Sequence, residues 1–121
     1  MKKDQSQICL QSRAFALRMV RLYRYLTENK KEFVLSKQIL RSGTGIGANV
    51  HEATQAQSRA DFISKQSIAL KEASETEYWL QLLIESSLVT KKQGEDLMHD
   101  LISILRMLTA SITTTKSQKS F

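Results

Sequence analysis

The scarcity of turn-forming residues constrains this chain more than any other feature of its sequence. The chain has no proline and only four glycines among 121 residues. A β-sandwich or β-barrel of this length would need frequent turns, and proline and glycine supply much of that turn chemistry. The sequence therefore favours a few long helices joined by short connections. A chain of this length is sufficient for one domain around one core.

Apolar residues recur at helical spacing in four segments of the chain. These segments cover residues 12–27, 36–54, 58–86 and 91–113. The pattern predicts an all-α protein, an up-down antiparallel four-helix bundle over residues 12–113. We expect residues 1–11 to form a flexible N-terminus and residues 114–121 to form a frayed tail.

Capping residues precede three of the four segments. Ser36 is a suitable N-cap for the second segment, and Ser58, followed by Asp61, is one for the third. Thr90 and Gln93 have the T-x-x-Q spacing of a capping box. These residues predict where the last three helices begin.

Three of the four glycines lie close together, at positions 43, 45 and 47. A dinucleotide-binding fingerprint needs a preceding strand and the spacing G-x-G-x-x-G, and neither is present. Instead, an apolar stripe continues through the glycines: Ile39, Gly43, Ile46, Val50 and Ala53. Since small residues allow helix axes to approach closely, the glycines predict a helix–helix contact.

The third segment carries apolar residues on two faces. One stripe runs from Phe62 to Ile84, and a helix in a single bundle needs only one such stripe to face the core. The second face suggests another packed surface, so we expect a homo-oligomer. Its predicted interface residues are Ile68, Tyr78, Trp79 and Leu82.

Positive charge is concentrated in the first part of the chain. The net charge is +6, and residues 1–35 hold eight Lys and Arg against three Asp and Glu. Four arginines of the first segment fall within an arc of about 140°, with Leu17 among them. Arginine binds phosphate through two parallel hydrogen bonds, so this face is a candidate nucleic-acid site. Its residues are Arg13, Arg18, Arg21, Arg24, Lys30 and Lys31.

Two alternatives to nucleic-acid binding remain open for this basic face. It could be a solvated surface that pairs in part with the chain's own acidic segment. It could also dock on an acidic surface of a protein partner.

The residues that usually carry catalysis are sparse. Cys9 is the only cysteine, and the two histidines, His51 and His99, belong to no Glu-x-x-His pair of the di-iron type. We therefore expect no catalytic residues, no metal and no cofactor. A lone thiol suits a reducing cytoplasm. With no signal peptide and no apolar run of about 20 residues, we expect a cytoplasmic protein without a membrane span.

Several polar residues lie in or beside the apolar stripes. A buried charge must be paired or neutralised, so such residues indicate either a hydrogen-bond network between helices or a catalytic site. We favour a network that fixes helix register, and keep a small enzyme using Glu52 or Glu77 as a distant alternative. The predicted members of the network are Arg41, Ser42, Asn49, Glu52 and Glu77.

Several motifs resemble those of a bacterial four-helix-bundle family, the proteins encoded in intervening sequences of 23S ribosomal RNA genes. The similarity covers residues 12–110, with R-S-x-x-x-I-x-A-N-x-x-E from Arg41 to Glu52 as its core. An Asp-Phe pair and the run E-Y-W-L follow in the third segment. Gly45 stands where the family often has serine, and Ala53 where it often has glycine.

The resemblance implies an antiparallel bundle that assembles into a homopentameric ring. It also implies a relation to the accessory variability determinant of diversity-generating retroelements, a basic pentamer that binds nucleic acid and a reverse transcriptase. The arginines are not part of the family motif, so their role follows from charge alone. We therefore expect a non-catalytic, oligomeric nucleic-acid-binding protein. The alternative is a protein-interaction scaffold or accessory factor, for example for a reverse transcriptase, that binds no nucleic acid itself.

Overall fold

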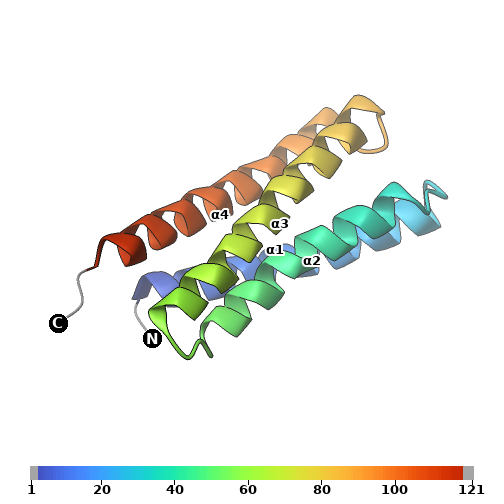
Figure 1. The fold of residues 1–121 in the computed structure, drawn as a ribbon. Helices are drawn as coiled ribbons and strands as arrows, with labels where there is room; N and C mark the ends of the chain where they lie inside the picture. The colour runs from blue at the N-terminus through green and yellow to red at the C-terminus, as the bar shows by residue number, and fades with distance from the viewer. Residues whose placement is uncertain (1–2, 119–121) are drawn as a thin grey trace.

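The computed structural model describes residues 3–118 of the chain, which form four helices in an up-down antiparallel bundle (Figure 1). The helices are α1 (Lys3–Glu28), α2 (Leu35–Ala53), α3 (Arg59–Glu85) and α4 (Lys91–Ser117). The first and last described turns lie at the same end of the bundle (Figure 1). The predicted all-α four-helix fold is confirmed.

The core is formed by one stripe from each helix. The predicted stripe of α2 from Ile39 to Ala53 is buried at all five of its positions. In α1, Phe15, Met19 and Leu26 are almost completely inaccessible to solvent. The core positions of α3 are small or polar as well as apolar, and they are Gln66, Ala69, Ala73, Thr76, Leu80 and Leu83. The small side chains let α3 approach its neighbours closely.

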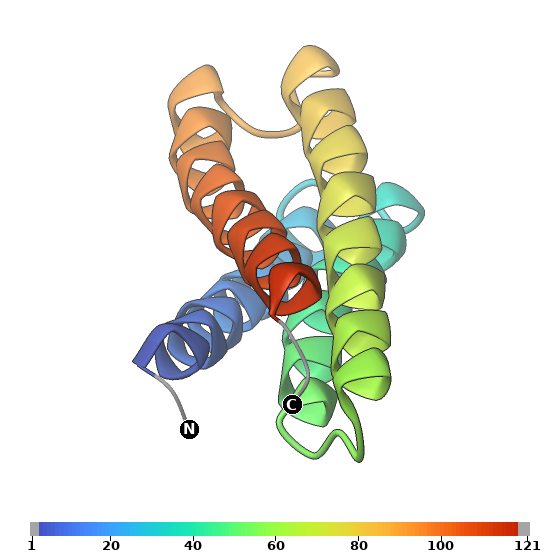
Figure 2. The same ribbon diagram turned by 60° about the vertical axis from the view of Figure 1, so that its left-hand side comes forward.

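The four helices do not pack with equal closeness. Helix α2 has extensive contacts with both α1 and α3, whereas the contact between α1 and α4 is the smallest. In Figure 2, α1 and α4 are inclined to one another instead of running alongside. The seam between α1 and α4 is therefore the most open side of the bundle.

The expected helix boundaries near the two chain ends are wrong. Helix α1 begins at Lys3 instead of residue 12, because Ile8 lies two turns before Phe15 and extends the buried stripe. The side-chain amide of Gln5 also donates a hydrogen bond of 2.9 Å to Ser111 Oγ, which ties the first turns of α1 to α4. Helix α4 continues to Ser117. Residues 1–2 and 119–121, which belong to the termini predicted as flexible and frayed, lie outside the described residues.

The glycines of α2 allow close contact with the neighbouring helices, as predicted. A Cβ atom at Gly43 would lie 2.4 Å from Met19 Cγ, and one at Gly47 would lie 3.2 Å from the backbone oxygen of Ser12. Gly45 faces the other way, and its Cβ would lie 3.0 Å from Glu72 Oε2. The glycines therefore set the distance of α2 from α1 on one side and from α3 on the other.

Two of the three predicted N-caps are confirmed. Ser58 Oγ accepts a hydrogen bond from the backbone N–H of Asp61. Thr90 and Gln93 form the complete capping box, with reciprocal bonds of 3.1 and 2.9 Å. In both places the pattern of side chains within four residues was enough to locate the start of the helix.

The predicted N-cap role of Ser36 is wrong, because Glu32 satisfies the first turn of α2. Its carboxylate accepts hydrogen bonds from the backbone N–H groups of Val34, Leu35 and Ser36 at 3.1, 2.9 and 2.8 Å. Partial burial tends to raise the pKa of Glu32, but these hydrogen bonds outweigh burial and hold the pKa below its ordinary value. Lys31, at a φ of 54°, turns the chain back so that Glu32 reaches these donors.

Glu32→Ala should therefore lower the free energy of unfolding by about 1 kcal/mol, the typical cost of losing a helix cap. A group with a depressed pKa stabilises the fold above its ordinary pKa and loses that effect as the pH falls through its folded-state value. The difference between wild type and Glu32→Ala should thus be fully present at pH 7 and decrease progressively as the pH falls below about 4. Urea unfolding followed by circular dichroism measures it. Glu28→Ala, at an exposed carboxylate, is the matched control, and an equal loss in both variants would contradict the capping role.

Candidate nucleic-acid interface

The outward face of α1 carries three exposed arginines. Arg13, Arg21 and Arg24 lie within an arc of about 80° at 100° per residue, opposite the buried stripe of the helix. None of their side chains forms a hydrogen bond or ion pair with another described residue. The guanidinium groups are therefore available to an anionic ligand.

Arg18, the fourth predicted phosphate contact, is already paired within the chain. Its Nη2 lies 2.6 Å from Asp96 Oδ2, and its Nη1 bonds to Asp100 Oδ2. Arg18 lies at the edge of the arc that faces α4, where two carboxylates one turn apart meet it. One alternative for the basic face is that it pairs in part with the chain's own acidic residues. Arg18 is paired in this way.

Lys30 and Lys31 extend the basic surface beyond the end of α1. Both are exposed in the turn between α1 and α2. The Nζ atom of Lys30 lies 5.9 Å from the centroid of the Tyr25 ring. The surface therefore continues from the arginines to an aromatic side chain, which charge analysis of the sequence did not identify.

Two leucines lie in the same arc as the arginines. Leu10 is 70% exposed and Leu17 is 51% exposed. Leu17 interrupts the arginines in the sequence, and Leu10 precedes it by two turns. The outward face of α1 is consequently basic with an apolar component.

The predicted polar network exists between α2 and α3, with partly different members. Arg41 bonds to Glu75, and its Nη1 lies 3.5 Å from Glu72 Oε2. Beside this ion pair, Thr76 Oγ1 donates to Ser42 Oγ at 2.9 Å, with both residues completely buried. These contacts join α2 to α3.

The other predicted members do not join this network. Asn49 donates within α2 to the carbonyl of Gly45 at 2.8 Å. Glu52 is exposed and Glu77 is half-buried, and the side chain of neither forms a hydrogen bond or ion pair with a described residue. Their places are taken by residues of α3 that sequence reasoning missed, because the pairing depends on which helix lies beside Arg41.

The predicted oligomer-interface residues lie on the outer side of α3. Ile68 is 40% exposed and Tyr78 is 55% exposed, whereas Trp79 and Leu82 are half-buried. The Tyr78 and Trp79 rings meet edge to face at a centroid distance of 5.1 Å. Trp79 Nε1 donates to Glu75 Oε1 at 3.4 Å, so the Trp79 side chain is held within its own chain. Ile68 and Tyr78 remain available for an external contact.

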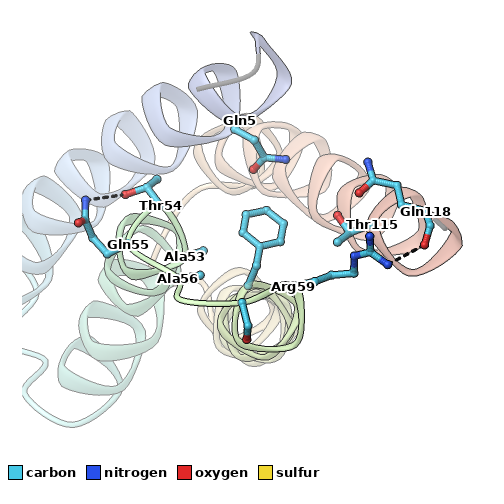
Figure 3. Close-up of a pocket in the computed structure, with 10 residues that line it drawn as sticks. Gln5, Ala53, Thr54, Gln55, Ala56, Arg59, Thr115 and Gln118 are labelled. Atoms are coloured by element: carbon cyan, nitrogen blue, oxygen red, sulfur yellow. Dashed lines mark hydrogen bonds between the residues drawn. The ribbon is translucent and has the colours of Figure 1, made fainter. Parts of the chain in front are cut away.

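A cavity of about 590 Å³ opens at the end of the bundle where the described chain begins and ends (Figure 3). Figure 3 shows Thr54 and Gln55 on one side of it and Thr115 and Gln118 on the other, with Arg59 bonded to the carbonyl of Gln118 at 2.7 Å. Next to the cavity, the buried Gln66 donates to Gln5 Oε1 at 2.9 Å. The lining is composed of amides, hydroxyls, small apolar groups, one phenylalanine and one arginine, and brings no acid–base pair together.

Within residues 3–118, no three His, Cys, Asp or Glu side chains come together in a way that could hold a metal ion. None of the helices in this part of the chain has a stretch long and apolar enough to span a bilayer. The half-buried Cys9 is desolvated, which raises the pKa of its thiol.

Comparison with known proteins shows a family and a similar fold among solved structures. The family model described as 23S rRNA-intervening sequence protein matches residues 4–110. A solved structure from Bacteroides thetaiotaomicron VPI-5482, a protein with unknown function from the S23 ribosomal protein family, has a TM-score of 0.90 and 54% sequence identity. The alignment covers 91% of this chain and 98% of that chain. A comparison with functionally curated proteins finds no match.

Proposed function

This chain belongs to the 23S rRNA-intervening sequence protein family, and we propose that it is a non-catalytic, cytoplasmic member that binds nucleic acid as a homo-oligomer. The observation that carries this proposal is the outward face of α1. Arg13, Arg21 and Arg24 are exposed there and make no ion pair with the described residues. The guanidinium groups of such a face can replace the counterions of a phosphate backbone.

The length of this face suits a polynucleotide better than a single small anion. Arg13 and Arg24 are eleven residues apart, which corresponds to about 16 Å along a helix. Lys30 and Lys31 prolong the positive surface past the end of α1. Several phosphates of one strand can therefore be contacted at once.

The buried polar groups support a structural rather than a catalytic role. Ser42 bonds to Thr76 across the α2–α3 contact, and Gln66 bonds to Gln5 between α3 and α1. Each of these bonds joins two helices, although the buried Gln66 Oε1 has no hydrogen-bond partner among the described residues.

The proposed assembly is a homopentamer, as the family resemblance implies. Ile68 and Tyr78 on α3 offer apolar surface that a second copy could cover. In such an assembly the arginine faces would be repeated, and avidity would raise the affinity for a long nucleic acid. Light scattering after gel filtration checks the subunit number, and a monomer at micromolar concentration would contradict the assembly.

Filter binding with structured RNA and with duplex DNA at 50 mM salt tests nucleic-acid binding. We expect the logarithm of the association constant to fall linearly with the logarithm of the salt concentration, with a slope of about −0.7 to −0.9 per phosphate contacted. Binding that does not respond to salt, or no binding of either nucleic acid at 50 mM salt, would contradict the proposal.

The exposed leucines favour a second candidate function, a scaffold for a protein partner. Leu10 and Leu17 lie among the arginines, and an acidic protein surface with apolar groups would match both features. Affinity capture from a nuclease-treated cytoplasmic extract separates the two functions. A partner retained after nuclease treatment, and lost on Leu10→Ser with Leu17→Ser, would favour the scaffold.

A further inference from the structure

A groove of about 440 Å³ lies between α1 and the start of α4, on the open side of the bundle. Its volume is within the range of about 300–1,000 Å³ that is typical of sites for small organic groups. Buried apolar side chains, Leu22, Val89 and Leu97, contribute to its lining. Polar and aromatic groups complete the groove, so an amphiphilic ring fits it better than an ion does.

One wall of the groove is continuous with the basic face of α1. Arg21 belongs to both, because it is part of the exposed arginine arc and also lines the groove. Tyr25, one turn further along α1, presents a half-buried ring to the same groove. A strand bound on the arginine face would thus pass an aromatic side chain within one helical turn.

The charges in the groove are nearly balanced. Arg18 lines it, but this guanidinium is paired with Asp96 and Asp100. A phosphate entering the groove would approach the Asp96 carboxylate in its wall, whereas a neutral base would not be repelled. Phosphates are therefore expected to stay outside on Arg21 and Arg24, and only an uncharged ring is expected to enter.

We propose that this groove receives an unpaired base of single-stranded nucleic acid, which stacks on Tyr25 while its flanking phosphates bind Arg21 and Arg24. The inference rests on the proposed function, since it names the form of nucleic acid that the basic face recognises. Stacking on aromatic side chains is the usual way in which proteins hold single strands without strict sequence preference. On the α4 wall, Gln93 and Asp96 are both exposed. Gln93 Oε1 caps α4, so its side-chain NH2 is placed to donate to a base carbonyl, and Asp96 Oδ1 is placed to accept from a base amino group. A duplex keeps its bases stacked and paired, so it can use the arginines but not the groove.

Fluorescence anisotropy with a labelled, unstructured 20-nucleotide RNA and the matching RNA duplex at 50 mM salt tests the proposal. The full-length wild-type chain should bind the single strand about tenfold more tightly than the duplex, a difference of the size that one stacked base provides. Tyr25→Leu should remove this preference and leave duplex binding and the salt dependence unchanged. Tyr25→Phe should keep the preference, because the ring remains.

Tyr23→Leu is the matched control, since it removes a half-buried tyrosine of α1 that does not line the groove. It should leave binding of both RNAs unchanged. If Tyr25→Leu fails to fold by circular dichroism, a single 2-aminopurine placed along the RNA gives a second readout with the wild-type chain. Its fluorescence should be quenched at one or more positions on binding.

Equal affinity for both RNAs with no effect of Tyr25→Leu would overturn the groove as a base site and leave the proposed function standing. Absence of 2-aminopurine quenching at every position would also overturn it. Failure of both RNAs to bind at 50 mM salt would instead overturn the proposed function itself.

Discussion

Replacing Arg13, Arg21 and Arg24 together by glutamine should weaken RNA binding by at least about 100-fold at 50 mM salt, if each arginine contacts one phosphate. The three side chains are exposed and form no ion pair with the described residues, so their loss should leave the fold intact. The salt dependence should also become shallower, by about two units in the logarithmic slope for each protomer that contacts the strand. Filter binding over a salt series measures both quantities.

Two control variants separate phosphate contact from net charge. Replacing Lys37, Lys71 and Arg106 by glutamine removes the same charge from exposed positions on the other three helices. Arg18→Gln removes an arginine of α1 that is already paired with Asp96 and Asp100. The first should bind RNA much like the wild type, and Arg18→Gln, which leaves Asp96 unpaired in the groove wall, should weaken binding far less than the triple replacement. Equal weakening in the first control would show that overall charge, and not the α1 face, determines binding.

The same substitution at two glycines of α2 should have opposite effects on stability. Gly45→Ser should raise the free energy of unfolding by about 1 kcal/mol, because serine costs less than glycine inside a helix. Its hydroxyl can also donate to Glu72 Oε2, a buried atom that accepts no hydrogen bond and is only 3.5 Å from Arg41 Nη1, once the Glu72 carboxylate has moved slightly from the new Cβ.

Gly43→Ser should instead lower the free energy of unfolding by about 2 kcal/mol, the usual scale of overpacking in a core. Its Cβ would lie 2.4 Å from Met19 Cγ, and Met19 is completely buried. Urea unfolding of the two variants and the wild type gives the comparison. Stabilisation by both substitutions would mean that helix propensity alone matters and that α1 and α2 separate easily at Gly43.

The features that could be predicted from sequence are those determined within one or two helical turns. The buried stripe of α2 and the caps at Ser58 and Thr90 belong to this group, since each depends on spacings of three or four residues. The sequence pattern does not predict the true start of α1, because the buried Ile8 is surrounded by polar residues. A single apolar residue is too weak a signal to predict two more helical turns. The cap of α2 was missed because Glu32 reaches its donors through the left-handed backbone at Lys31.

The sequence by itself determined the helices, their buried faces and the concentration of basic residues on the outer side of α1. Only the tertiary structure decided which of those basic residues remain available. Arg18 meets Asp96 and Asp100 because α4 lies beside it, and Arg41 meets Glu72 and Glu75 because α3 lies beside α2. The periodicity of one helix specifies which side chains point outward, whereas an ion pair or a groove depends on the position of a second helix far away in the sequence.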